Sequence, residues 1–213
     1  MLITISREYG AGGSEVARRV AEALGWSVID NEVVERVAIR AGLSAEEVAR
    51  RDERAPGFVE RLARTLATST PELFSPPAPE VEELKESRLV KITESVVAEV
   101  AAQGRVVLVG RAAPAVLGRQ RDALHVRVVA PKEYRLTIAA ERLGGDAKLA
   151  ERTLEETDRN RARYHREYYQ RDWSDPVHFH MVLNTAFLGM EGAAGAIVAE
   201  ARRLGWDRAE AGS

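Results

Sequence analysis

The sequence predicts an α/β fold in which a parallel sheet of five strands is covered by helices on both faces. Three observations indicate it: five short apolar runs, helix-period segments between them, and a glycine turn directly after the first run. The chain has 213 residues and is 45% hydrophobic, which is enough for one α/β domain with inserted parts.

The expected strands lie at 2–5, 27–29, 106–109, 125–129 and 181–183. After the first strand and its glycine turn, a helix should begin near Ser14. It should carry Val16, Val20 and Leu24 inward and stop at Gly25. The chain therefore opens as strand, glycine turn and helix.

Two connections are too long for simple crossovers. Residues 31–104 contain the breaker cluster at 75–79, so we expect a helical insertion there. Residues 131–171 form a second helical stretch, interrupted at 143–146 and ending in a basic, aromatic segment. We interpret 144–174 as a lid region.

Composition excludes several classes of function. The chain has no cysteine, and its four histidines show no metal-ligand spacing, so disulfide and structural zinc chemistry are not expected. No apolar stretch reaches the roughly 20 residues that a membrane span needs, and the first residues lack a signal-peptide pattern. The net charge of −2 argues against a general nucleic-acid binder. We expect a cytoplasmic protein with small-molecule partners, neither nucleic acid nor membrane.

The glycine turn is the main candidate site. Glycines let the backbone wrap an anion, and the N–H groups that open the next helix point at it with the positive end of the helix dipole. Against the P-loop pattern G-x-x-x-x-G-K-[ST], Arg7 replaces the first glycine and Gly13 replaces the lysine. A glycine-rich turn without a ligand is the alternative. The candidate cofactor-binding residues are Gly10, Ala11, Gly12, Gly13 and Ser14.

A dinucleotide site of the Rossmann type is the competing interpretation. Gly10 and Gly12 begin a G-x-G motif, and Asp30 ends the second strand, where a ribose-binding acid would lie. However, Glu15 stands in place of the third glycine, and its carboxylate would face a pyrophosphate.

The motifs in order resemble the cytidylate kinase-like family. The resemblance rests on the segments 3–14, 107–111 and 158–161, with further matches listed here: Ala17, Leu24, Gly25, Asp30, Tyr164, Tyr168, Trp173, Asp175, Pro176, Asn184 and Thr185. It implies a P-loop NTPase fold and phosphoryl transfer from ATP, with Mg2+, to a nucleoside monophosphate, CMP or dCMP first.

Phosphoryl transfer to an anionic acceptor needs charge neutralisation and positioning more than a strong base. Arg7 is our candidate to replace the missing lysine, the alternative being a surface arginine. Ser14 is the candidate magnesium ligand, or else only a helix N-cap.

The part of the site that binds the phosphate acceptor is predicted from the residues that follow the second and third strands. By resemblance, Arg111 binds the acceptor phosphate, and Asp30 lies near the acceptor pocket or magnesium. For Asp30, a role in capping the turn is an equally open alternative. Cytidylate kinases have Gly-Arg-Asp here, whereas Ala112 follows Arg111 in this chain, which puts cytosine specificity in doubt. A kinase for another small acceptor, or a nucleotide-binding regulatory protein with little turnover, therefore stays open.

The predicted lid carries the remaining catalytic candidates. Arg159 and Arg161 are favoured by resemblance to kinase lids, Arg161 after a break in the helix. A solvated arginine face is the alternative.

Overall fold

In a computed structural model of the protein, the structure describes residues 1–30, 94, 97–110, 112–118 and 120–206. The chain divides into two compact units, Met1–Ile29 with Gly104–Ser213, and Asp30–Gln103. Of the second unit only Asp30, Glu94 and the helical residues 97–103 are described. The predicted insertion at 31–104 thus lies mostly outside the described residues and stays a prediction.

All five predicted strands are present, and they form one sheet. They are β1 (Leu2–Arg7), β2 (Ser27–Asp30), β3 (Val106–Val109), β4 (Ala123–Val129) and β5 (Met181–Asn184). The sheet order is β2-β3-β1-β4-β5. β1 pairs in parallel with β3 and β4, and β4 pairs in parallel with β5. Because β1 is central, the glycine turn that follows it lies in the middle of the carboxyl edge, where open α/β sheets bind ligands.

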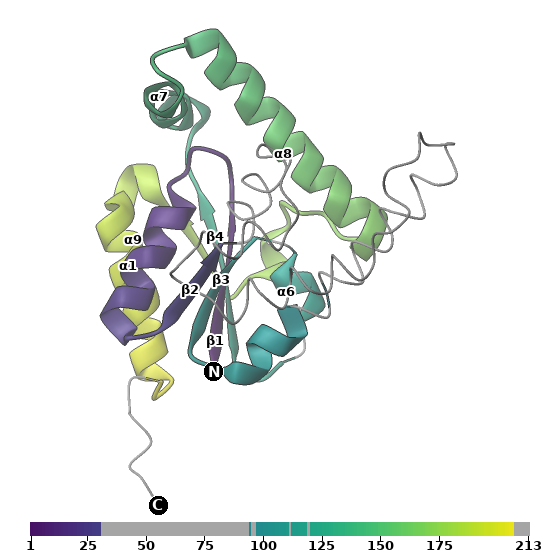
Figure 1. The fold of residues 1–213 in the computed structure, drawn as a ribbon, viewed down its shortest axis with the longest axis vertical. Helices are drawn as coiled ribbons and strands as arrows, with labels where there is room; N and C mark the ends of the chain where they lie inside the picture. The colour runs from purple at the N-terminus through teal and green to yellow at the C-terminus, as the bar shows by residue number, and fades with distance from the viewer. Residues whose placement is uncertain (31–93, 95–96, 111, 119, 207–213) are drawn as a thin grey trace, which may run out of the picture. The chain divides into compact units, whose positions relative to one another are not determined.

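One face of the sheet is covered by α1 (Gly13–Leu24) and α9 (Thr185–Arg203) (Figure 1). Ile3 and Ile5 of β1 are fully buried on this face, in one cluster with Val16 of α1 and Ile197 of α9. This apolar burial is the main driving force for folding. The predicted inward positions of the first helix are confirmed, since Val16 and Val20 are buried and Leu24 packs against the same cluster.

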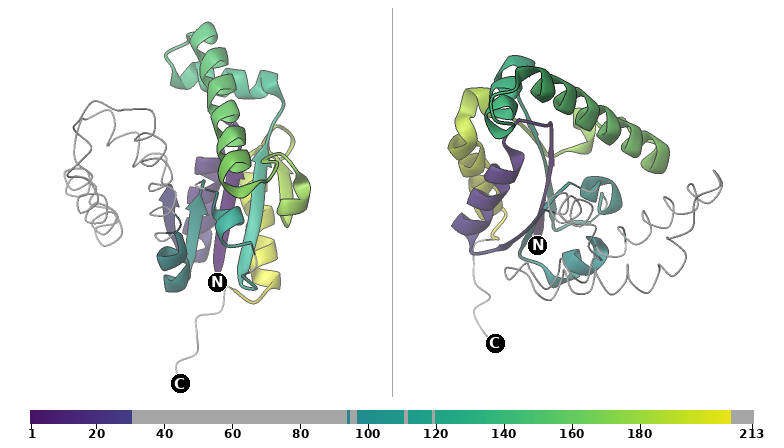
Figure 2. Two further views of the ribbon diagram at one scale, coloured as in Figure 1. Left: turned by 90° about the vertical axis from the view of Figure 1, so that its right-hand side faces the viewer. Right: turned by 45° about the horizontal axis from the view of Figure 1, so that its top comes forward.

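The other face of the sheet carries polar side chains, because strand residues alternate between faces. Thr4 and Ser6 of β1 lie opposite His125 and Arg127 of β4 in the parallel register. All four are buried. The short α6 (Ala113–Val116) and the end of α8 (Ala147–Tyr169) lie on this side (Figures 1 and 2).

Glycines set both ends of α1. Gly12 is the N-cap with φ 78°, and Gly25 is the C-cap with φ 66°, both in the left-handed region that favours glycine. Gly25 confirms the predicted stop. Ser14 lies inside the helix, so the alternative that it is the N-cap is wrong.

Two α-helices and the short 3-10 helix η1 (Pro176–His178) lie between β4 and β5. α7 (Lys132–Arg142) is followed by Gly144 and Gly145, both with positive φ, and then by α8, whose N-cap Asp146 accepts a hydrogen bond from the Leu149 N–H. The interruption predicted at 143–146 is confirmed. The break predicted near Arg161 is wrong, because α8 is continuous through the whole arginine-rich stretch.

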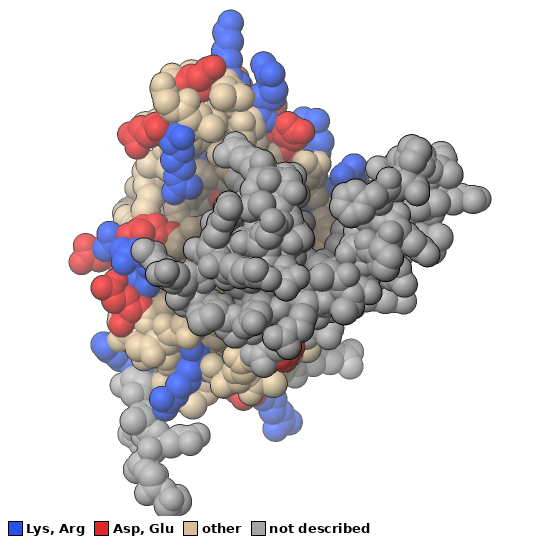
Figure 3. All heavy atoms as spheres, in the orientation of Figure 1, with Lys and Arg blue, Asp and Glu red and all other residues tan. Residues whose placement is uncertain are grey.

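The surface of α1 shows acidic and basic side chains side by side (Figure 3). Arg18 and Arg19 both pair with Glu15, and the Arg18 hydrogen bond is the main cause that lowers the pKa of Glu15 to about 2. Glu15 is thus engaged on the helix surface, and this arrangement gives no support to a dinucleotide site. Within the described part of the chain, no helix is long and apolar enough to cross a membrane.

Candidate active site

The glycine turn after β1 is a compact loop. The Ala11 N–H donates to the Glu8 carbonyl at 3.2 Å, and Gly10 has φ 80°. A Cβ on Gly10 would lie 2.5 Å from the Arg135 carbonyl oxygen, and one on Gly12 would meet the Met190 side chain at 2.7 Å. Both positions therefore need glycine, for space as well as for backbone conformation.

The loop leaves backbone donors for an anion. Within the described residues, the N–H groups of Gly10, Gly12 and Gly13 have no hydrogen bond inside the protein. They lie where the positive end of the α1 dipole adds to their attraction for negative charge. The Ala11 N–H closes the turn instead, while its carbonyl accepts a hydrogen bond from the Thr185 hydroxyl at 2.8 Å. These donors fit a phosphate chain, and Ser14 follows them in the first turn of α1.

Arg7 ends β1 directly before this loop and is buried, with 7% of its surface exposed. Its side chain packs on Gly13, where an added Cβ would lie 2.6 Å from the Arg7 Cβ. The alternative of a surface arginine is therefore wrong. Gly13 holds the position of the P-loop lysine, so the stem of Arg7 occupies the space that a side chain there would need.

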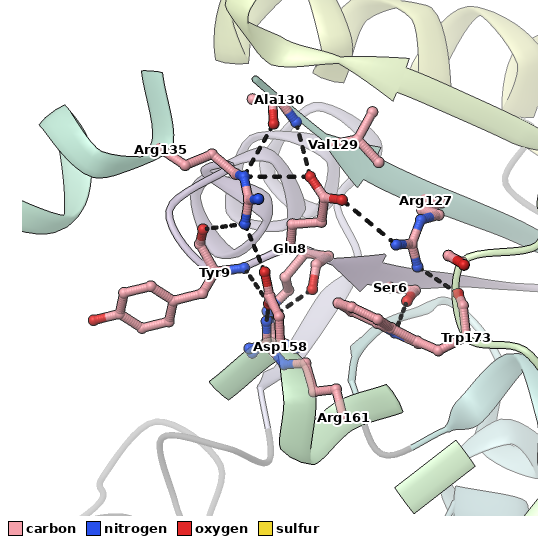
Figure 4. Close-up of polar contacts among 12 residues, drawn as sticks. Ser6, Glu8, Tyr9, Arg127, Val129, Ala130, Arg135, Asp158, Arg161 and Trp173 are labelled. Atoms are coloured by element: carbon pink, nitrogen blue, oxygen red, sulfur yellow. Dashed lines mark hydrogen bonds and ion pairs between the residues drawn. The ribbon is translucent and has the colours of Figure 1, made fainter. Parts of the chain in front are cut away.

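A network of charged groups surrounds the other side of the loop (Figure 4). Glu8 accepts a hydrogen bond from the Ala130 N–H at 3.2 Å and lies 3.4 Å from the Arg135 Nε. Arg135 in turn donates to Asp158 at 2.6 Å. Asp158 of α8 is thereby joined to the loop. The sequence analysis assigned no role to Glu8 or to Arg135. Glu8 lies within the loop motif itself, but the motif does not assign that position.

The two lid arginines occupy different surroundings. Arg161 is partly buried and donates to the Arg7 carbonyl at 2.8 Å and to Asp158 at 3.2 Å. Arg159 lies on the exposed side of α8, near Glu155. The structure thus brings Arg161 to the loop, and it places Arg159 at the surface.

Arg127 lies beneath the loop, on the polar face of the sheet. Its guanidinium stacks 4.3 Å from the Trp173 ring centre and donates to the Trp173 carbonyl at 2.6 Å, while the indole N–H donates to Ser6 at 3.1 Å. Burial lowers the pKa of Arg127, and Glu8, 3.7 Å away, opposes that shift. Arg127 links β4 with the segment after α8. The sequence analysis did not single out Arg127, although an arginine between two valines of a strand is a signal that could have done so.

The histidines have a structural arrangement. His125 and His180 stack with ring centres 5.0 Å apart, and the backbone N–H of His125 donates to the His180 Nδ1 at 2.9 Å. Thr4 contacts the His125 Nδ1 at 2.8 Å. Burial, with smaller effects of His180 and Arg171, lowers the pKa of His125 to about 4. Among the described residues, no group of three or more His, Cys, Asp or Glu could hold a metal ion.

The acceptor end of the site is described only in part. Asp30 is the last residue of β2 and is partly buried. Arg111 lies outside the described residues, so its role stays a prediction. Ala112, directly after it, is buried and has φ 50°.

The parallel sheet and the glycine loop after its central strand define a P-loop nucleotide-binding protein of the α/β class. The sequence model of the cytidylate kinase-like family matches residues 2–186, and the chain therefore belongs to the cytidylate kinase-like family. The members of this family are kinases, and the chain is therefore a phosphotransferase by family.

Individual relatives and solved structures are similar to this chain to different degrees. A cytidylate kinase from Natronomonas pharaonis is 27% identical over 196 residues, which cover 90% of this chain and 84% of the relative. The crystal structure of an uncharacterized protein from Eubacterium ventriosum has a TM-score of 0.59 at 19% identity, covering 94% of this chain and 97% of that one. The second likeness shows the fold alone. A shikimate kinase from Acinetobacter baumannii has a TM-score of 0.46 at 16% identity, covering 95% and 91% of the two chains, and carries no argument about the substrate.

Proposed function

We propose that the protein transfers the γ-phosphoryl group of ATP to a nucleoside monophosphate, with CMP or dCMP as the first candidates. Family membership supports the reaction class. The observation that carries the proposal is the buried packing of Arg7 on Gly13, which provides a cation beside the glycine loop although the P-loop lysine is missing. Phosphoryl transfer depends on such positive charge close to the transferred group.

The loop residues would bind the phosphate chain of ATP. The N–H groups of Gly10, Gly12 and Gly13 would hold the β-phosphate, because they lie at the start of α1 and in the loop just before it. The Ser14 hydroxyl would bind Mg2+. A magnesium site with few protein ligands is chemically reasonable, since Mg2+ commonly keeps waters and takes other oxygens from substrate phosphates. The ion supplies neutralisation of phosphate charge when it is bound.

The arginines would stabilise the charge that develops during transfer. Arg7 and Arg161 approach the loop from β1 and α8, and the Arg161 guanidinium is already hydrogen-bonded to the Arg7 carbonyl. We assign Arg111 and Asp30 to the acceptor by family resemblance, and Arg159 to the closing lid. A nucleoside monophosphate carries its own negative charge, so no residue is needed as a strong base.

A kinase for another small acceptor is the second candidate. Ala112 favours it, because it is a buried apolar residue at the position where cytidylate kinases carry an aspartate for cytosine. An alanine side chain has no hydrogen-bonding group with which to read a base.

Two measurements test the proposed function. Titration calorimetry should show ATP and ADP binding that depends on Mg2+, whereas binding of NADH with no binding of either nucleotide would favour the dinucleotide interpretation. A panel assay of ATP consumption against the common nucleoside monophosphates would then identify the acceptor. Nucleotide binding with no turnover on any acceptor would favour the regulatory alternative.

A further inference from the structure

One ion pair holds both backbone polar groups of a residue in the phosphate loop. The Tyr9 N–H donates to the Asp158 Oδ1 at 2.9 Å, and the Tyr9 carbonyl accepts from the Arg135 Nη1 at 3.3 Å. The Arg135 Nη1 also donates to the Asp158 Oδ2 at 2.6 Å (Figure 4). Arg135 and Asp158 are only 12% and 17% exposed, so water screens the pair weakly.

Arg135 has further contacts that fix its position. Its Nε donates to the Ala130 carbonyl at 3.0 Å and lies 3.4 Å from Glu8. Its own carbonyl packs so closely on Gly10 that no side chain fits there. A guanidinium can bind several acceptors at once in a fixed plane, which an ammonium cannot do. The first turn of α7 is therefore tied to the loop by one side chain and one backbone group.

The planarity of the peptide bond carries this constraint to the anion site. The Tyr9 carbonyl and the Gly10 N–H belong to one trans peptide plane and point in opposite directions. Holding the carbonyl toward Arg135 turns the Gly10 N–H away from Arg135. In the same way, the Tyr9 N–H shares a plane with the Glu8 carbonyl, which accepts the bond that closes the loop turn. Two successive peptide planes are thus oriented by Asp158 and Arg135.

We propose that Arg135 and Asp158 are positioning residues for the phosphate loop, which set the orientation of the Gly10 N–H for phosphate binding. This inference rests on the proposed function. Asp158 also pairs with Arg161, so the same carboxylate orients a loop peptide and the arginine that approaches the loop. Both residues act through the loop.

The chain offers a matched control for this proposal. Lys132 of α7 pairs with Glu151 and Glu155 of α8 at 2.9 and 2.8 Å, so among the described residues it joins the same two helices through ion pairs that do not include the loop. If the ion pair of Arg135 only held α7 against α8, loss of the Lys132 pairs would have a similar effect.

The test compares Arg135→Lys, Asp158→Ala and Lys132→Gln with the wild type. NMR hydrogen exchange should show a faster Tyr9 amide in the first two variants, and thermal unfolding confirms that each variant is folded. ADP and inorganic pyrophosphate should both bind about 10-fold more weakly or worse, the scale of a lost hydrogen bond to a charged group. Pyrophosphate has no base, so an equal loss for both ligands locates the effect at the loop. Lys132→Gln should match the wild type in Tyr9 exchange and in the binding of both ligands.

Three results would overturn the proposal. One is unchanged ADP binding in Arg135→Lys and Asp158→Ala. Another is an equal loss of ADP binding in Lys132→Gln, which would mean that the ion pair of Arg135 and Asp158 only holds α7 against α8. A third is loss of ADP binding with normal pyrophosphate binding. If the wild type binds neither ligand, the proposed function itself fails, and the proposal fails with it. The Tyr9 exchange rates would then still report whether the ion pair holds the peptide.

Discussion

The stem of Arg7 occupies the space beside Gly13, the residue that stands where a P-loop carries its lysine. A Cβ on Gly13 would lie 2.6 Å from the Cβ of Arg7 and 3.0 Å from its Cδ. The two departures from the P-loop pattern are therefore one structural feature. Because the side chain of Arg7, from the end of β1, fills this space, a residue with a side chain does not fit at the lysine position.

The charge of Arg7 can be removed without removing its stem. We expect Arg7→Met to lower turnover by roughly 100-fold or more, the scale of losing a group that stabilises transition-state charge. The methionine keeps apolar volume in the buried site, so the free energy of unfolding should change much less than with alanine. Steady-state kinetics and urea unfolding measure the two effects. Arg18→Met, on the exposed side of α1, is the control. Near-normal turnover in Arg7→Met would remove Arg7 from the proposed mechanism.

Restoring the usual lysine should be harmful by itself. Gly13→Lys places a Cβ inside the Arg7 side chain, and we expect a loss of about 1–3 kcal/mol in the free energy of unfolding, as in other overpacked sites. The double variant Arg7→Gly with Gly13→Lys should recover part of that stability and more activity than Arg7→Gly alone. Denaturant unfolding and turnover of the wild type, the two single variants and the double variant together form a double-mutant cycle. Additive effects in the cycle would show that Arg7 and Gly13 do not compete for space.

The fold followed from the sequence because its signals are local. Five apolar runs, with Gly25 as a helix stop, were enough to place the strands and the first helix. The packing of Arg7 on Gly13 was not predictable, since it depends on the path of the loop. Glu8 and Arg135 were missed for a related reason: they are 127 positions apart, and only the folded chain brings them together. The helix break near Arg161 was a wrong prediction, because α8 reaches the loop without one.

The preference of the enzyme for one nucleobase over another tests the predicted acceptor-binding part of the site. Ala112 offers no carboxylate to cytosine, so we expect kcat/KM for CMP and UMP to differ by less than the roughly 10⁴-fold that a dedicated hydrogen-bonding pocket can reach. Ala112→Asp should raise the preference for CMP if the base lies there. Discrimination of more than about 10⁴-fold in the wild type would mean that another residue reads the base.

Buried histidines predict a loss of stability in acid. The pKa of His125 is lowered to about 4, mainly by burial, and that of His165 is likewise lowered to about 4 by burial and by Arg127 and Arg171. The folded state therefore favours neutral rings. The stabilisation of the folded state by these neutral rings is complete above pH 6.5, the pKa of histidine in the unfolded chain. It is lost as the pH falls from 6.5 through 4. A shift of that size corresponds to roughly 3 kcal/mol for each ring.

Unfolding at a series of pH values checks the acid prediction. His125→Gln removes one titrating ring while keeping a polar group near Thr4. The variant should lose less free energy of unfolding than the wild type between pH 7 and pH 4, by roughly 3 kcal/mol. Parallel curves for the two proteins would show that His125 titrates alike in the folded and unfolded states.

The predicted lid can be tested through its two arginines, which differ in position on one helix. Arg161 already contacts the loop, so we expect Arg161→Ala to lower turnover by about 100-fold and to weaken ATP binding less, because its charge matters most in the transition state. Arg159 is exposed, and we expect it to reach a phosphate only when α8 moves toward the bound nucleotides. A turnover loss in Arg159→Ala therefore reports closure.

Closure also has a direct readout. A group that binds phosphate only in the closed state gives the ligand a higher affinity for that state, which is the physical requirement for ligand-driven closure. Hydrogen exchange across 144–174 should slow when both nucleotides are bound, and much less with ATP alone. A closed lid would also exclude water and suppress ATP hydrolysis. Unchanged exchange in the ternary complex, with full activity in Arg159→Ala and Arg161→Ala, would mean that neither arginine of α8 takes part in the transfer and that the charge at the loop comes from Arg7.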